Sequence, residues 1–298
     1  MVFGPWITLR ADHVKTFAIV LIALNSCIAS AQSTSDAKEV SKTDLQPTSC
    51  KPVYLTLDTG HMEVAPLIAD ILRKHQVKVT FFAANERTKT GDGSLGNHWA
   101  SWWKARAQEG HEFASHTYNH TYWRADVAGG LNQAVQFKVR PSAGPSEGQD
   151  FTWTAKQYCD ELGLSNTRLQ EITGKKPLPL FRAPGGKTSP ALLAAAKSCG
   201  YQHVGWSPAG FLGDELPSEK FPNDALLKKA LQNIKSGDVL LAHLGIWSRK
   251  DPWAPAVLEP LITGLQSRGF CFKTLRERPY DKAWIESPAA ATSEKLTK

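Results

Sequence analysis

The sequence predicts an α/β protein whose parallel sheet is closed or nearly closed into a barrel. Short apolar runs, rich in β-branched and aromatic residues, alternate with segments of helical periodicity along the chain. Sequential βα units imply a parallel sheet, and seven of them in about 235 residues suit a barrel. A doubly wound open sheet is the alternative, but no glycine-rich dinucleotide fingerprint follows the first strand.

The expected elements follow one another with short connections. The first strand, residues 53–57, is an apolar run that ends abruptly at Asp58. Further strands are expected at residues 77–83, 111–115, 178–182, 201–206, 239–243 and 270–275. Helices are expected at residues 64–72, 99–109, 154–173, 190–198, 224–234 and 254–267. Residues 121–152 contain paired glycines and two prolines, which predict a long loop.

The first 31 residues are typical of a secretory signal peptide. Arg10 and Lys15 precede an apolar run that is too short to span a membrane, and residues 29–31 form a small-x-small cleavage site. An anchor helix and a lipoprotein box ending at Cys27 are the alternatives. The sequence therefore predicts an exported protein, periplasmic or secreted in a bacterial cell envelope, with no membrane span in the mature chain. The remaining chain divides into a linker at 32–50, the barrel domain at 51–285 and a disordered tail at 286–298.

Charge and cysteine content narrow the possible partners and the redox compartment. The formal net charge of +7 suits an anionic envelope polymer, whereas no basic run interleaved with aromatic residues indicates nucleic acid. The oligomeric state is not indicated. Loss of residues 1–31 leaves four cysteines, which permit two disulfides in any of three pairings or remain buried thiols. These cysteines are Cys50, Cys159, Cys199 and Cys271.

Four of the expected strands end in chemically capable side chains, namely Asp58, His116 with His120, Arg182, and His243. The carboxyl ends of parallel strands meet at one edge of a barrel, where active sites form. Spacing of i, i+4 places the two histidines on one face of a helical turn, within reach of one metal ion. A capping aspartate, surface histidines, a surface ion pair of the arginine and a core histidine are the alternatives for these positions. Their occurrence at the same edge favours an active site.

These residues lie in five motifs that follow one another over residues 51–276. The motifs are residues 56–60 (Thr-Leu-Asp-Thr-Gly), 115–120 (Ser-His-Thr-Tyr-Asn-His), 181–186 (Phe-Arg-Ala-Pro-Gly-Gly), 206–214 and 239–243 (Val-Leu-Leu-Ala-His). In order and spacing they resemble the polysaccharide deacetylases of carbohydrate esterase family four, the NodB-homology group. The resemblance implies a distorted (β/α) barrel of about seven strands. It also implies metal-dependent removal of N- or O-acetyl groups from an acetylated polysaccharide.

The resemblance assigns a role to each strand-end residue. His116 and His120 hold a divalent ion that lowers the pKa of a water and polarises the acetyl carbonyl. Zinc is the expected ion, with cobalt or another first-row divalent ion as the alternative. Asp58 is the general base, Arg182 holds it in place and ionised, and His243 protonates the leaving group. Backbone N–H groups after the arginine stabilise the oxyanion.

Three departures from the family pattern affect the expected site. Thr59 replaces the family's second aspartate, usually the third metal ligand, so that Asp58 or a residue of the inserted loop must complete the shell or affinity must fall. Gly185 replaces a tyrosine, which removes a ring from the groove wall. Ser207 follows Trp206 where the family pairs an acid with the catalytic histidine, and Asp214 is the candidate replacement. Gly185, Trp206 and Asp214 are also candidate substrate contacts.

Tryptophans and the choice of function complete the expectations. Flat rings near strand ends could stack on sugars, and these are Trp206, Trp247 and Trp253. The helical group Trp99, Trp102 and Trp103 is expected in the core.

The alternatives to a deacetylase are a carbohydrate-binding protein on an impaired barrel, which Thr59 favours, and a C–N hydrolase acting on small cyclic amides. Retention of a base, an arginine and an acid argues against the first alternative, and the signal peptide argues against the second.

Overall fold

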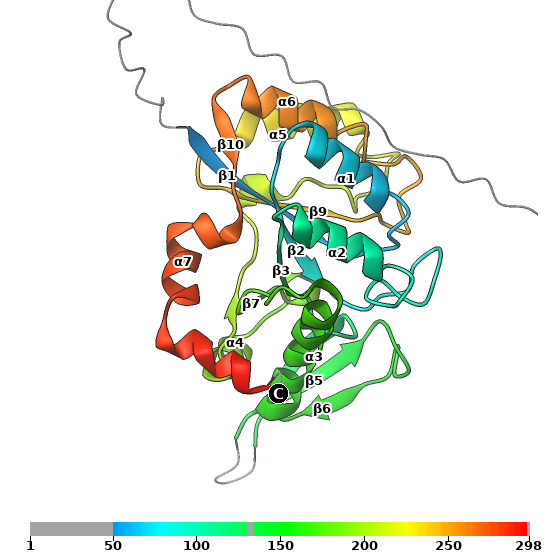
Figure 1. The fold of residues 1–298 in the computed structure, drawn as a ribbon. Helices are drawn as coiled ribbons and strands as arrows, with labels where there is room; N and C mark the ends of the chain where they lie inside the picture. Colours follow the sequence, from blue (N-terminus) through cyan, green and yellow to red (C-terminus); the bar gives the residue numbers. More distant parts are fainter. Residues whose placement is uncertain (1–49, 130–133, 297–298) are drawn as a thin grey trace, which may run out of the picture. The chain divides into compact units, whose positions relative to one another are not determined.

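The computed structural model describes residues 50–129 and 134–296, whose path is traced in Figure 1. The predicted signal peptide at 1–31 and all of the predicted linker except Cys50 lie outside the described residues. Within the described ranges no helix has both the length and the apolar character that a membrane span requires.

A parallel sheet of seven strands forms the centre of the described chain. Its strands are β1 (Lys51–Asp58), β2 (Thr80–Ala83), β3 (Glu112–Ser115), β7 (Leu180–Phe181), β8 (Gln202–His203), β9 (Val239–His243) and β10 (Phe270–Phe272). They run in the order β10-β1-β2-β3-β7-β8, and β9 also pairs with β1. The predicted α/β barrel fold is confirmed, although several strands, β7 and β8 above all, are shorter than the sequence predicted.

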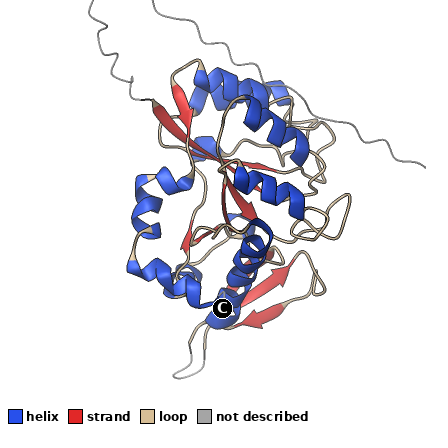
Figure 2. Ribbon diagram, viewed as in Figure 1, coloured by secondary structure: helices blue, strands red, loops and turns tan. Residues whose placement is uncertain are grey.

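Helices lie around the sheet and bury it (Figure 2). They are α1 (Ala65–Lys74), α2 (Ala100–Gln108), α3 (Ala155–Thr173), α4 (Pro190–Ser198), α5 (Asn223–Asn233), α6 (Leu258–Gln266) and α7 (Pro279–Ile285). Ile68, Ile71 and Leu72 face the core from α1 at helical spacing, against the fully buried Leu55 and Leu57 of β1. Because β1 is buried from Val53 to Asp58, it carries the catalytic candidate at its end into a rigid interior.

The barrel is distorted because its two edges are joined by a loop. In the described chain β8 and β9 share no ladder. Instead, Ser207 N–H donates to Val239 O and Val239 N–H donates to Ser207 Oγ, both at 3.0 Å. Phe211 then forms a single parallel bridge with Leu241. Ser207, noted above as a departure, therefore closes the barrel here.

A second sheet corrects the prediction of a long loop at 121–152. Antiparallel strands β4 (Thr121–Val127), β5 (Gln136–Pro141) and β6 (Phe151–Trp153) pair in that order. Phe137 and Val139 of β5 are buried against Tyr158 of α3 and Phe181 of β7. The glycines and prolines that predicted a loop lie between or at the ends of the strands, where sheets tolerate them.

The chain end differs from the predicted disordered tail. A 3-10 segment, η4 (Pro288–Leu296), follows α7 and packs on α3 and α4. Ala290 is buried, and the backbone of Ser293 passes so close to Gly200 that a Cβ there would lie 2.3 Å from the Ser293 nitrogen. An Ala/Ser-rich composition indicated disorder, but small side chains are also what close packing of this kind requires.

All four described cysteines form disulfides, which settles the pairing left open by the sequence. Cys50 pairs with Cys271 and joins the start of β1 to β10 across 221 residues. Cys159 of α3 pairs with Cys199 at the end of α4, across 40 residues. Neither pair lies among the residues of the pocket described below.

Candidate active site

A pocket opens at the carboxyl ends of β1, β3 and β9, the edge that the sequence predicted. Thr59, His116, His120 and His243 line it, together with Glu86 from the loop after β2. Register pairs Asp58 directly with His243, because β1 and β9 run parallel and end together. The structure thus brings together the strand-end residues that lie far apart in the sequence.

Asp58 and Arg182 form a buried ion pair at the base of this pocket. Arg182 Nη1 donates to Asp58 Oδ1 at 2.6 Å, and both side chains are almost completely buried. Its Nε and Nη2 donate to the carbonyl oxygens of Val204 and Gly205, and its guanidinium lies over the Phe82 ring, 4.2 Å from the centroid. A buried carboxylate is held in its charged form by such a partner. Asp58 Oδ1 is therefore held by the arginine, whereas Asp58 Oδ2 lies 3.5 Å from His116 Nε2.

The glycines beside Asp58 explain how its backbone fits. A Cβ on Gly60 would lie 2.0 Å from the carbonyl oxygen of Gly245, so only glycine allows the two strand ends to approach this closely. His61 N–H then donates to that same oxygen at 3.2 Å. The Asp-Thr-Gly sequence thus lets the β1 end lie against the β9 end that carries His243.

His116 and His120 lie side by side, with ring centroids 4.8 Å apart. His116 Nδ1 donates to the carbonyl oxygen of Arg182 at 2.9 Å. Ser142 Oγ donates to the His120 carbonyl oxygen and therefore accepts from His120 Nδ1 at 2.6 Å. Both Nδ1 atoms thus carry the proton, and both Nε2 lone pairs are left for a cation. Burial also lowers the pKa of His116 well below its usual value, which keeps that ring neutral.

The turn that carries the two histidines is not the predicted helical one. Thr117 and His120 have left-handed backbone, at φ 58° and 48°. The buried Glu161 of α3 holds this shape by accepting from Asn119 N–H at 2.5 Å and from Thr121 Oγ1 at 3.0 Å. A glutamate some 40 residues away overrides the local preference for a helix.

Thr59 stands beside this pair, at the end of β1. Its Oγ1 accepts from Ala84 N–H at 3.1 Å, and its own N–H donates to Phe82 O. The threonine therefore ties β1 to the loop after β2, and a neutral hydroxyl engaged in this way is a poor ligand for a divalent ion.

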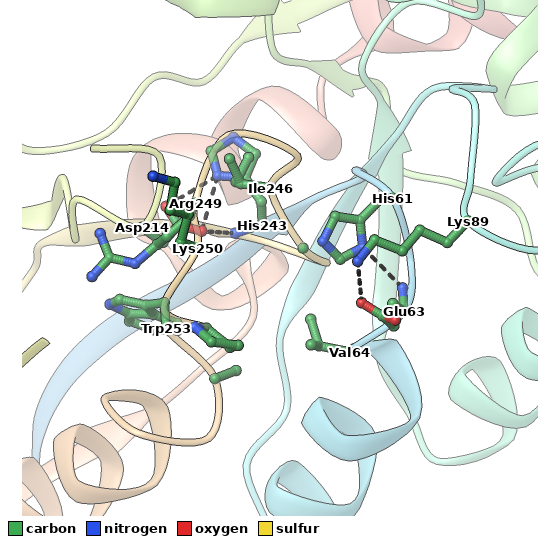
Figure 3. Close-up of a pocket in the computed structure, with 13 residues that line it drawn as sticks. His61, Glu63, Val64, Lys89, Asp214, His243, Ile246, Arg249, Lys250 and Trp253 are labelled. Carbon is green, nitrogen blue, oxygen red and sulfur yellow. Dashed lines mark hydrogen bonds and ion pairs between the residues drawn. The ribbon is translucent and has the colours of Figure 1, made fainter. Parts of the chain in front are cut away.

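His243 and Asp214 form the second titratable pair of the site (Figure 3). His243 Nδ1 lies 3.1 Å from both carboxylate oxygens, and His243 N–H donates to Asp214 Oδ2 at 2.7 Å. Burial alone would lower the pKa of His243, but Asp214, Asp58 and Glu215 outweigh it and raise the pKa to about 9. The imidazole is therefore protonated at neutral pH. Asp214 therefore contacts His243, as the role of replacement acid predicted, while its candidate role as a substrate contact stays a prediction.

Tyr122 occupies the space beside Gly185. A Cβ on this glycine would lie 3.0 Å from the Tyr122 ring, and the glycine has left-handed backbone at φ 62°. The expectation that the groove wall lacks a ring is wrong, because β4 of the second sheet supplies one. Trp206 lies against the next glycine, Gly186, and lines the same pocket.

The other tryptophans divide between the pocket and the core. Trp247 is half-exposed at the pocket edge, where Arg87 lies over its ring at 4.8 Å. Trp253 is 4% exposed and packs in the core, so it offers little ring surface for stacking on a sugar. The helical tryptophans pack in the core as predicted, and these are Trp99, Trp102 and Trp103.

Several residues of the pocket escaped the sequence reasoning. Glu86 lies three residues beyond β2, whereas we considered only side chains at the strand ends themselves. Tyr122 belongs to the sheet that was taken for a loop, and Ser142, which contacts His120 from behind the pocket lining, follows β5 directly. Glu215, also in the pocket, follows Asp214 directly. For Glu86 the available signal was an acidic residue following an apolar strand at the same barrel edge.

The residues of this pocket fit a divalent ion in part. Two imidazoles whose Nδ1 atoms are engaged in hydrogen bonds can bind an ion through Nε2, and His116 Nε2 lies 3.5 Å from Asp58 Oδ2. Within the described residues, however, no three His, Cys, Asp or Glu side chains already surround one point. One buried polar atom of the pocket also has no hydrogen-bond partner, and that atom is Glu86 Oε2.

Comparison with known proteins agrees with this geometry. A model of the polysaccharide deacetylase family matches residues 45–204. The peptidoglycan-N-acetylmuramic acid deacetylase PdaA of Bacillus subtilis is 28% identical over 236 residues, which cover 78% of this chain and 73% of that protein. A peptidoglycan-N-acetylglucosamine deacetylase of Bacillus cereus is 26% identical over 232 residues, covering 78% and 89%. A family 4 acetyl xylan esterase from Clostridium thermocellum, solved with a cobalt ion, shares the fold at a TM-score of 0.57 and 23% identity, covering 78% and 92%.

Proposed function

Since this chain belongs to the polysaccharide deacetylase family, whose members are hydrolases, we propose that it removes N- or O-acetyl groups from a cell-envelope or extracellular polysaccharide with the help of a divalent metal ion. Peptidoglycan is the first substrate to test, because two similar proteins are named for it and the chain carries a net charge of +7.

One observation carries the proposal: a carboxylate paired with an arginine and a histidine paired with an aspartate share the edge of one barrel. Arg182 donates to Asp58 at 2.6 Å, while Asp214 raises the pKa of His243 to about 9. Environments that drive two titratable groups apart in this way are typical of a base and an acid acting on one substrate.

His116 and His120 would hold the ion through their Nε2 atoms, with zinc expected and cobalt as the alternative. When bound, a divalent ion supplies Lewis acidity, lowering the pKa of a water and polarising the acetyl carbonyl. Support comes from the hydrogen bonds that engage Nδ1 of both rings and leave Nε2 as the atom for the ion, and from the cobalt ion in the acetyl xylan esterase.

The other steps belong to residues of the chain. Asp58 Oδ2 accepts a proton from the attacking water, whose oxygen bonds to the acetyl carbon. The Gly185 N–H, at the pocket wall, donates to the developing oxyanion. His243 then gives a proton to the leaving nitrogen or oxygen as its bond to the acetyl carbon breaks, which yields acetate and a free amine or hydroxyl.

Acetate release tests this proposal. We expect release from at least one of acetylated peptidoglycan, chitin oligomers, xylan or an exopolysaccharide, with loss on chelation and recovery on adding Zn²⁺ or Co²⁺. A carbohydrate-binding protein on an impaired barrel is the second candidate, because Thr59 replaces a metal-binding carboxylate. It predicts binding of the polymer without release of acetate. Release that survives complete metal removal would contradict the metal-dependent mechanism.

Export is the remaining part of the proposal. It is supported by the signal-peptide pattern of residues 1–31 and by relatives that are named for cell-wall polymers. Amino-terminal sequencing of the periplasmic or secreted protein should begin near Gln32. An intact Met1 in that fraction would contradict cleavage.

A further inference from the structure

The strongest unexplained feature of the pocket is the carboxylate of Glu86. Its side chain is only 19% exposed, and Oε2 is inaccessible to solvent without a hydrogen-bond partner. Leaving a buried carboxylate oxygen unpaired costs free energy, so such an atom calls for an explanation. Coordination of a cation would satisfy this oxygen.

Position relates this carboxylate to the two histidines. Glu86 Oε1 lies 3.9 Å from His120 Nδ1, and Glu86, His116 and His120 line the same pocket. The carboxylate therefore lies beside the His120 ring, in the pocket that His116 also lines.

The backbone of Glu86 is fixed rather than loose. Glu86 N–H donates to Ser94 Oγ at 2.9 Å, and Ser94 N–H donates back to Glu86 O at 2.9 Å. Next to it, Asn85 N–H donates to the carbonyl oxygen of Tyr118, inside the turn that carries the histidines. The loop after β2 is thus attached to the turn that carries the histidines, and this attachment holds the Glu86 backbone next to them.

The other acids of the pocket are already engaged or lie elsewhere. Arg182 holds Asp58 through Oδ1, while Asp58 Oδ2 lies 3.5 Å from His116 Nε2, and His243 holds Asp214. Glu215 lies on the His243 side, since its pKa, which burial raises, is influenced by His243, Asp214 and Asp58. Thr59 is neutral. Glu86 is therefore the acid on the His120 side of the pocket that is not held by an arginine and that has a carboxylate oxygen without a hydrogen-bond partner.

We propose that Glu86 is the third protein ligand of the metal ion, and that it replaces the carboxylate missing at Thr59. The acid has moved from the end of β1 to the loop after its neighbour β2, and the ligand set becomes His116, His120 and Glu86. Two imidazoles and one carboxylate, with a position open for water, form a common catalytic zinc site. This inference rests on the proposed metal dependence.

Direct metal binding tests it. Dissociation constants for Zn²⁺ and Co²⁺ are measured by competition with a chromophoric chelator, and the visible spectrum of bound Co²⁺ reports its ligands. Wild type is compared with Glu86→Gln and with the matched control Glu215→Gln, which removes the same charge from the same pocket. Because loss of groups that merely support ligands weakens binding ~10–100-fold, Glu86→Gln should cost at least that, and the Co²⁺ spectrum should change. Glu215→Gln should keep the wild-type spectrum and nearly the wild-type affinity.

A rescue variant sharpens the test. Thr59→Asp combined with Glu86→Gln places a carboxylate at the end of β1 again, and it should recover most of the lost affinity. The Gln side chain removes no hydrogen bond of Oε2, so the metal-free variant should melt as wild type does. If Glu86→Gln fails to fold, Glu86→Asp replaces it in the test. The shorter side chain of Glu86→Asp should bind the metal ion more weakly than wild type does.

Each outcome separates the two levels of inference. If wild type binds no divalent ion, the proposed metal dependence fails. If wild type binds tightly and Glu86→Gln binds equally well with the same spectrum, Glu86 is not a ligand although metal dependence stands. If Glu86→Gln and Glu215→Gln weaken metal binding equally, the affinity depends only on the net negative charge of the pocket, and the assignment of Glu86 as a ligand is overturned.

Discussion

Replacing Asp214 by asparagine tests the proposed general acid. Asparagine keeps the size of the side chain and an oxygen near His243 Nδ1, but it removes the negative charge 3.1 Å away. That charge is the largest effect raising the pKa of His243 to about 9. Without it burial dominates, and the pKa should fall to about its ordinary value of 6.5 or lower.

The size of the effect follows from these values. At pH 8 a histidine of pKa 9 is about nine-tenths protonated, and one of pKa 6.5 about one-thirtieth, so the population of the acid falls roughly 30-fold. A bound dication lowers the pKa in both proteins, and the comparison is therefore the difference between them. In the pH dependence of acetate release, the alkaline limb should move down by about 2.5 pH units or more in Asp214→Asn.

Stability offers a second measurement with a defined sign. Because folding raises the pKa of His243 above 6.5, its protonation stabilises the native state below pH 6.5, and this stability is lost as pH rises through 9. The shift corresponds to about 3 kcal/mol of unfolding free energy. Asp214→Asn should lose this contribution, while Glu215→Gln should change it far less. An alkaline limb and a stability profile that match wild type would refute the reasoning.

Three further predictions concern other parts of the structure. Asp58→Asn should lower acetate release ~10²–10⁴-fold, and it should lower the melting temperature because Arg182 keeps a buried charge without its anion; near-normal release would remove Asp58 as the base. Gly185→Tyr should reduce both stability and activity, because a Cβ there would lie 3.0 Å from the Tyr122 ring and the backbone of Gly185 is left-handed. Adding Tyr122→Ala should recover part of both losses. Equal defects in the single and double variants would contradict this steric account. Replacing both cysteines of the α3–α4 disulfide by serine should cost about 2–5 kcal/mol in denaturant unfolding, with an unchanged unfolding free energy as the contradicting result.

The sequence predicted the strand ends well because the signal is local. Each apolar strand with a polar residue at its end reads the same in isolation as in the fold, and β9 was placed at its observed residues. Asp58, His116, Arg182 and His243 therefore met at one edge as expected. A local pattern could not predict which residues, distant in the sequence, contact these side chains in the fold.

Long-range contacts account for the errors. The turn at His116 is held by Glu161, and the buried face of β5 is completed by α3 and β7, both distant in the sequence. Glu86 reaches the pocket only because β2 lies beside β1 in the sheet. Partners such as these depend on how elements pack, which no short window of sequence contains.

The disulfide between Cys50 and Cys271 of β10 bears on where the enzyme can be attached to a solid support. Residue 50 lies at the amino end of β1, and Asp58 lies at its carboxyl end, roughly 25 Å away along the strand. Anything fused or immobilised ahead of residue 50 is therefore attached at the edge opposite the pocket. A force applied at that attachment acts on β10 as well as on β1, because the disulfide links the start of β1 to β10. In such an arrangement a bulky polymer approaches from the free side.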